Sequence, residues 1–60
     1  MTKTKAKRLR NGDEVVVVRD GLAMRGQLIG DPCVHHDDIF VDVETREVGF
    51  LPDVHHTELR

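Results

Sequence analysis

Histidine and cysteine are the residues of this chain best suited to bind a metal ion. Histidine occurs as two adjacent pairs, His35-His36 and His55-His56, and the single cysteine, Cys33, precedes the first pair. Imidazole and thiolate are ligands that Zn²⁺ prefers in a tetrahedral site. Cys33, His35 and His55 are therefore candidate ligands of a small zinc-binding domain, with His36 and His56 as the alternatives within each pair. Their spacing matches no standard zinc signature. The leading interpretation is that these are polar loop residues that hold no metal.

Two further features bear on catalysis. Cys33 would need a nearby base and an oxyanion hole to act as a nucleophile, and no glycine-rich turn or helix N-terminus follows it. The neighbouring acids Asp37-Asp38 and Asp13-Glu14 are adjacent in sequence and are not opposed across a cleft, so neither pair is expected to act as an acid/base couple. Adjacent histidines on a strand point to opposite faces, so only one of each pair is expected to serve in a site. The prediction is a protein that is not an enzyme and has no cofactor.

The N-terminal ten residues carry a concentrated positive charge. They hold five basic residues and no acid, whereas residues 11–60 hold eleven acids against four arginines, which together give the net charge of −2. The basic residues are Lys3, Lys5, Lys7, Arg8 and Arg10. We interpret residues 1–10 as a flexible basic arm that contacts nucleic acid through its phosphates. The alternative is a frayed, solvated terminus.

The length of 60 residues limits the core and the compartment. A single core in a chain this short supplies about 3–5 kcal/mol, so a homo-oligomer or a state stabilised by a partner protein is expected. One cysteine cannot form an internal disulfide, which indicates a cytoplasmic protein. No apolar run reaches the roughly 20 residues of a membrane helix, and no apolar stretch follows the basic start as a signal peptide would require.

From Gly12 onward the pattern is that of short β-strands. Four consecutive valines at positions 15–18 favour a strand, and Asp20-Gly21 is typical of a type I′ hairpin turn. The second strand is expected over residues 22–29, with Gly26 at a bulge or tight bend, and Gly30-Asp31-Pro32 is expected to end it. Residues 33–38 are expected to form a loop. The remaining strands are predicted at residues 39–44, 48–51 and 57–60, with a helical or 3-10 turn at residues 52–55.

These elements predict an all-β fold in which residues 11–60 form a small SH3-like barrel of about five strands, with a 3-10 turn before the last strand. Eight residues are expected to point inward: Val15, Val17, Leu28, Ile39, Val41, Val43, Phe50 and Leu59. Four other apolar residues are left for an exposed strip, which we interpret as a binding interface: Val16, Val18, Phe40 and Leu51.

Two family resemblances support the barrel. Gly12-Asp13-Glu14-Val15-Val16-Val17, Gly21 and Gly26-Gln27-Leu28-Ile29-Gly30 resemble the opening of SH3-like barrels, including the KOW type of transcription and ribosomal proteins. Gly26-Gln27-Leu28-Ile29-Gly30-Asp31-Pro32-Cys33 is also similar to the plasmid-encoded type II dihydrofolate reductases, which are tetrameric SH3-like barrels that use NADPH. The catalytic stretch of that family is Val-Gln-Ile-Tyr. Here it is Val48-Gly49-Phe50-Leu51, which lacks the glutamine amide and the tyrosine hydroxyl.

The resemblance therefore implies the fold more than the chemistry. The leading interpretation is a non-enzymatic interaction module, an accessory or regulatory factor of bacterial or phage type that binds a protein partner or itself. An NADPH-dependent reductase and the zinc-binding domain are the alternatives.

Overall fold

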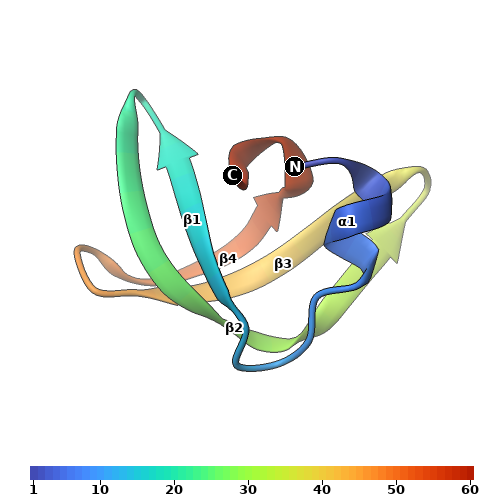
Figure 1. Ribbon diagram of the computed structural model, residues 1–60, viewed down its shortest axis with the longest axis horizontal. Coiled ribbons are helices and arrows are strands. Elements are labelled where there is room, and N and C mark those ends of the chain that lie inside the picture. The colour runs from blue at the N-terminus through green and yellow to red at the C-terminus, as the bar shows by residue number, and fades with distance from the viewer.

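The computed structural model describes residues 1–60 and contains one antiparallel sheet, a short N-terminal helix and a C-terminal 3-10 turn (Figure 1). The four strands follow the order β1-β2-β3-β4, and each neighbouring pair is antiparallel. The predicted β architecture with a late 3-10 turn is confirmed at this level. The elements are α1 (Lys3–Lys7), β1 (Glu14–Arg19), β2 (Leu22–His35), β3 (Asp38–Thr45), β4 (Gly49–His55) and the 3-10 turn η1 (His56–Glu58).

The four strands form one open sheet, and the predicted closed barrel of about five strands is not seen. Residues 57–60, expected to be the last strand, form no strand: their backbone pairing with β1 is a bridge between Val17 and Leu59 and a 2.9 Å hydrogen bond from the Arg60 N–H to the Val16 carbonyl. The 3-10 turn also lies later than expected, because residues 52–55 continue β4. Pro52 is tolerated there because β4 is an edge strand and its pairing with β3 shifts between Val41 and Val43, opposite Pro52 and Asp53.

The turn between β1 and β2 is as predicted, but β2 is longer than predicted. Asp20 and Gly21 both have positive φ, 53° and 76°, as a type I′ turn requires. β2 runs through residues 30–32, where the pairing with β3 shifts between Ile29 and Cys33, so these residues form a bulge and do not end the strand. The strand bends sharply there (Figure 1). Residues 33–35 are consequently strand, and the predicted loop is reduced to a turn at His36 and Asp37.

Gly26 marks a close approach of neighbouring strands. It pairs with Val15 on one side and with Thr45 on the other. A Cβ atom added to Gly26 would lie 2.5 Å from the Glu44 carbonyl oxygen and 2.6 Å from Val43 Cγ1. The position therefore needs glycine for space, whereas the predicted bulge lies further along β2.

The core lies on the concave side of the sheet and contains seven of the eight residues predicted to point inward. Phe50 is the exception, because it pairs with Glu44 on the outer face and is 51% exposed. Leu51, one residue later, pairs with Val43 and packs against the core instead. Met24 and Val54, which the sequence did not single out, are buried in the core.

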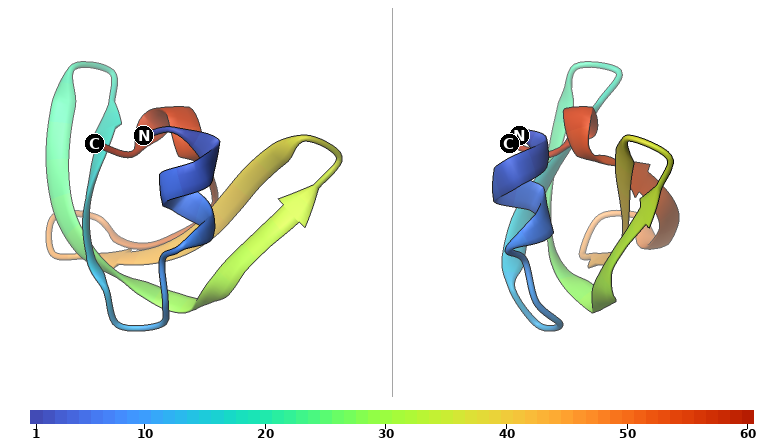
Figure 2. Two further views of the ribbon diagram at one scale, coloured as in Figure 1. Left: turned by 45° about the vertical axis from the view of Figure 1, so that its right-hand side comes forward. Right: turned by 90° about the vertical axis from the view of Figure 1, so that its right-hand side faces the viewer.

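Residues 1–10 contain the helix α1 and contact the rest of the chain, and the flexibility expected of this arm stays a prediction. Thr2 caps α1 through its side-chain oxygen, 3.2 Å from the Lys5 nitrogen, and Ala6 is fully buried. Met1 and Leu9 pack against the core, and the N-terminal amine donates a hydrogen bond to the Leu59 carbonyl. The two termini accordingly lie side by side (Figure 2). Met1, Ala6 and Leu9 are single apolar residues within a strongly basic stretch, so the charge pattern did not indicate that they would be buried or pack against the core. Neither helical segment has the length and apolarity needed to cross a bilayer.

Candidate functional site

The basic residues of the first ten positions form what we call the cationic segment: Lys3, Lys5, Lys7, Arg8 and Arg10. All five are exposed, on α1 and directly after it. The ion pairs of the structure are Arg19 with Glu58 and His55 with Asp38, so no member of the cationic segment is paired with a carboxylate. Burial of Ala6 fixes α1 against the body and leaves these side chains in solvent. The predicted nucleic-acid residues are thus gathered on one short segment, and none of them forms an ion pair.

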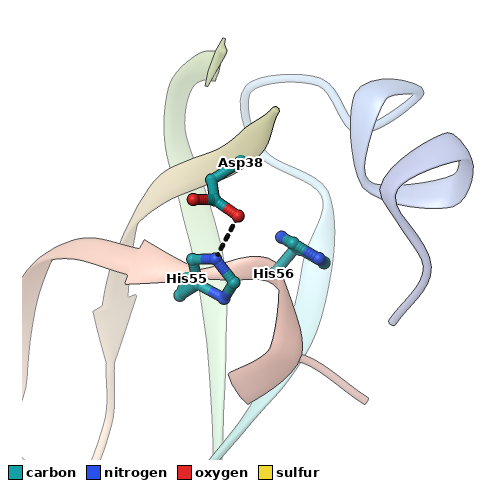
Figure 3. A group of neighbouring side chains, drawn as sticks. All are labelled: Asp38, His55 and His56. Atoms are coloured by element: carbon teal, nitrogen blue, oxygen red, sulfur yellow. Dashed lines mark hydrogen bonds and ion pairs between the residues drawn. The ribbon is translucent and has the colours of Figure 1, made fainter. Parts of the chain in front are cut away.

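A second group of polar side chains gathers where β4 passes into η1. Asp38, His55 and His56 place ligand-type atoms within 4.8 Å of one another (Figure 3). Asp38 begins β3, His55 ends β4 and His56 begins η1, so two segments distant in sequence converge. The two histidine rings are 4.2 Å apart between centroids and tilted by 37°. The expectation that adjacent histidines point to opposite faces is wrong here, because the strand ends between them.

His55 holds its ring in place through both nitrogens. Its Nε2 lies 2.9 Å from Asp38 Oδ1, and its Nδ1 lies 2.7 Å from Thr57 Oγ1. The Thr57 N–H also donates to Nδ1, at 3.3 Å. His55 and Glu58 form a capping box, in which the backbone N–H of His55 donates to Glu58 Oε1. This local network fixes the His55 ring against Asp38.

The Asp38 carboxylate is held in its charged form. The hydrogen bond from His55 is the main reason that the pKa of Asp38 lies below its ordinary value, and the nearby charges of His55 and Lys3 act in the same direction. Half of the Asp38 side chain remains exposed. The carboxylate is therefore ionised at neutral pH and open to solvent.

His56 is buried, unlike His55, which is only partly so. Its Nδ1 accepts the Ile39 N–H at 3.4 Å, beyond the usual range for such a bond. Nδ1 therefore carries a lone pair and Nε2 carries the proton when the ring is neutral. Sequence reasoning named His55, with His56 as its alternative, as a candidate metal ligand but missed Asp38. The spacing His55-His56-Thr57-Glu58, with glutamate three residues after a possible cap, was the available signal for a turn starting there.

The other candidate metal ligands lie apart from this group. Cys33 is exposed and pairs with Phe40, which in turn pairs with His55, so a full strand separates the thiol from the imidazole. His35 is exposed and its ring stacks edge-on against His36, 4.5 Å away. Cys33, His35 and His55 are thus not brought together as one set. Cys33, His35, Phe40 and Asp53 instead line a shallow hollow of about 340 Å³.

The four residues assigned to the apolar strip do not form one surface. All are half-buried, but Leu51 packs against the core, whereas Val16 and Val18 lie on the outer side of β1, opposite Arg25 and Ala23. Phe40 lies two strands away from β1, against the edge of the His55 ring. The apolar side chains most exposed to solvent are others: Leu22, Ile29, Val34, Val48 and Phe50.

The largest hollow, about 690 Å³, lies across β1, β2 and β3. Its charged lining mixes both signs: Glu14, Glu44, Arg25, Arg46 and Arg60. This mixture favours no single class of charged ligand. Comparison with protein-family models, curated proteins and solved structures gave no match.

Proposed function

We propose that the protein is a small non-enzymatic binding module that contacts the phosphate backbone of nucleic acid through the cationic segment. The observation that carries this proposal is the absence of any carboxylate partner for those five side chains, although residues 11–60 contain eleven acids. Cations that are already paired release few counterions on binding, whereas unpaired ones are free to neutralise phosphates.

The acidic remainder of the chain, which we call the body, sets the orientation of the protein on nucleic acid. Residues 11–60 carry four arginines against eleven acids, so the rest of the molecule repels phosphates while the cationic segment attracts them. Binding through one short segment limits the contact to a few phosphates and gives no reading of base sequence. The module is accordingly a weak, sequence-independent anchor.

Salt dependence tests this proposal. If all five cations contact duplex DNA, the logarithmic slope of affinity against salt is about −4.5, so raising salt fourfold weakens binding by roughly 500-fold. Fluorescence anisotropy with a labelled 20-base-pair duplex measures the slope. Neutralising Lys3, Lys5 and Lys7 to glutamine should reduce its magnitude by about 3.

The matched control neutralises three arginines of the body, Arg25, Arg46 and Arg60, which changes the net charge equally. This control should keep the salt slope of the wild type. Equal losses in the two triple variants would contradict a dedicated segment, and no measurable binding at low salt would contradict the proposal itself.

A protein partner or a second copy of the chain is the second candidate. It is favoured by five large apolar side chains that are each about half exposed, Phe50 and Val48 among them. Size-exclusion chromatography with light scattering separates these cases, since self-association gives a mass above that of one chain. A stable monomer at micromolar concentration would contradict the homo-oligomer.

We also propose that the fold is that of the SH3-like barrels. The curl of the sheet and the Val17–Leu59 bridge support a barrel whose last strand is reduced to one residue pair.

The enzymatic alternative is a type II dihydrofolate reductase. Gly49, Phe50 and Leu51 provide no polar side chain that could bind its substrate. Oxidation of NADPH in the presence of dihydrofolate tests it. A cytoplasmic accessory factor of bacterial or phage origin fits the module best.

A further inference from the structure

We propose that Asp38, His55 and His56 bind one Zn²⁺ ion at the junction of β4 and η1. This donor set differs from the cysteine-containing one suggested by the sequence, and the proposal is independent of nucleic-acid binding. Two imidazoles and one carboxylate are a donor set that suits Zn²⁺, whereas Mg²⁺ and Ca²⁺ require mostly oxygen ligands.

The distances are close to those of a coordinated ion. With metal–ligand bonds of about 2.0–2.1 Å, two ligands of a tetrahedral site lie about 3.3 Å apart. The donor atoms of the three residues already lie within 4.8 Å of one another, and Asp38 Oδ1 and His55 Nε2 are 2.9 Å apart. Small side-chain rotations are enough to complete the site, because no backbone segment has to move to bring the donors together.

His55 has the supporting contact that a metal-ligating histidine needs. Ligating imidazoles almost always donate their second N–H to a fixed partner, which sets the tautomer and the ring orientation. Thr57 Oγ1, 2.7 Å from Nδ1, is such a partner. In this structure Nδ1 accepts the Thr57 N–H, so Nε2 carries the proton and donates it to Asp38. Zn²⁺ would take the place of that proton on Nε2, and Nδ1 would then carry a proton and donate it to Thr57 Oγ1.

His56 supplies a second nitrogen ligand from the buried side of the site. Figure 3 shows one of its ring nitrogens on the side that faces Asp38 and His55. Coordination through Nδ1 would take the acceptor from the buried Ile39 N–H, a cost that the coordination bond must exceed, and that hydrogen bond is already long at 3.4 Å. Because half of the Asp38 side chain is exposed, water can occupy the fourth position.

One neighbouring charge opposes the ion. Lys3 lies near enough to Asp38 to influence its ionisation electrostatically, and its ammonium would repel a divalent cation. Lys3 is exposed and unpaired, so its flexible side chain is free to turn away. Because glutamine has no positive charge to repel the ion, replacing Lys3 by glutamine should strengthen zinc binding.

Isothermal titration of the untagged full chain with ZnCl₂ tests the site, and Co²⁺ provides a visible absorption signature of tetrahedral coordination. We expect one ion per chain and an affinity at least about tenfold weaker in Asp38→Asn, since even the loss of an outer-shell contact weakens metal binding by roughly 10–100-fold. Asp38→Asn keeps an acceptor for His55 on an exposed side chain, so the fold should survive. Circular dichroism of the variant checks this.

Two controls identify the ligands. Asp37→Asn removes the adjacent acid of the β2–β3 turn and should bind as the wild type does. The double variant His35→Ala/His36→Ala removes the other histidine pair and should also bind normally. Zinc binding that persists unchanged in Asp38→Asn, that disappears in the double variant, or that is absent in the wild type at millimolar ZnCl₂ would overturn the proposal.

Discussion

Arg19 and Glu58 form a two-point ion pair that ties the end of β1 to η1. Arg19 Nε lies 2.7 Å from Glu58 Oε2, and Arg19 Nη2 lies 3.2 Å from Oε1. The same carboxylate also accepts the backbone N–H of His55. Together with the bridge between Val17 and Leu59, this pair holds the C-terminal turn against the opposite end of the sheet. The proposed zinc ligands His55 and His56 thereby acquire a fixed backbone.

Glu58→Gln should lower the free energy of unfolding at pH 7 by about 0.5–1 kcal/mol, because both side chains of the pair are roughly one-third exposed and such pairs are worth little. Gln retains the capping-box hydrogen bond, so the loss is confined to the charge. Urea denaturation of both proteins measures the difference. Glu47→Gln, in the exposed β3–β4 turn and in no ion pair, should be neutral.

The pH dependence of this difference has a definite sign. The hydrogen bonds from Arg19 are the main reason that the pKa of Glu58 lies below its ordinary value in the folded protein. The unfolded chain therefore takes up the proton at a higher pH, about 4.3. The stabilisation is fully present above that value and is lost as pH falls through the folded pKa. Wild type and Glu58→Gln should thus converge in acid, measured with EDTA present to exclude metal. A constant difference down to pH 3 would contradict this account.

Gly26→Ala should destabilise the sheet by about 2–3 kcal/mol, because the new methyl group meets the backbone of Glu44 and the side chain of Val43. In a domain of this size that is a large fraction of the total stability. Thermal unfolding followed by circular dichroism measures it. Gly30→Ala is the matched control. Its φ of 77° makes alanine strained, but nothing lies within 4 Å of the added atom, so the loss should be only about 1 kcal/mol. The reverse order would contradict the assignment of Gly26 to a close approach.

The sequence predicts the buried residues of β1 and β3 better than those of β4. Val15 and Val17, and Val41 and Val43, were placed in the core correctly because burial alternates along these strands, even through the four consecutive valines of β1. Phe50 was misplaced because β4 begins at Gly49, after a turn that depends on its positive φ of 78°. A shift of one residue at that turn exchanges the two faces of the strand.

The candidate site was predictable only as a set of residue types. The histidine pairs stand out in composition, but their convergence with Asp38 depends on two features that periodicity does not encode. One is the short turn at His36 and Asp37, which starts β3 at Asp38. The other is the change of backbone from β4 to η1 between His55 and His56, which brings both rings to one side.

Ala6→Asp should detach α1 from the sheet, because it places a charge at a fully buried position. A helix of five residues has no stability of its own once its packing is lost. Cleavage by trypsin after Lys5 and Lys7 should then accelerate strongly. Thr4→Asp, which adds the same charge at an exposed position of α1, should leave the cleavage rate unchanged. Equal protection of all three proteins would mean that Ala6 does not anchor the segment.

Phe50→Ser should leave the free energy of unfolding within about 0.5 kcal/mol of the wild type, although phenylalanine is the largest apolar residue type in the chain. Its side chain is half exposed on the outer face, opposite Glu44, so little apolar surface is lost. Val54→Ala, only four residues away, should lower the free energy of unfolding by about 2 kcal/mol. This change removes the volume of two methyl groups from a fully buried position. Chemical denaturation of the two variants below the concentration of any self-association decides the comparison. A larger loss for Phe50→Ser would return Phe50 to the core and shift the register of β4 by one residue. If the loss instead appears only at high protein concentration, Phe50 stabilises a contact between copies of the chain.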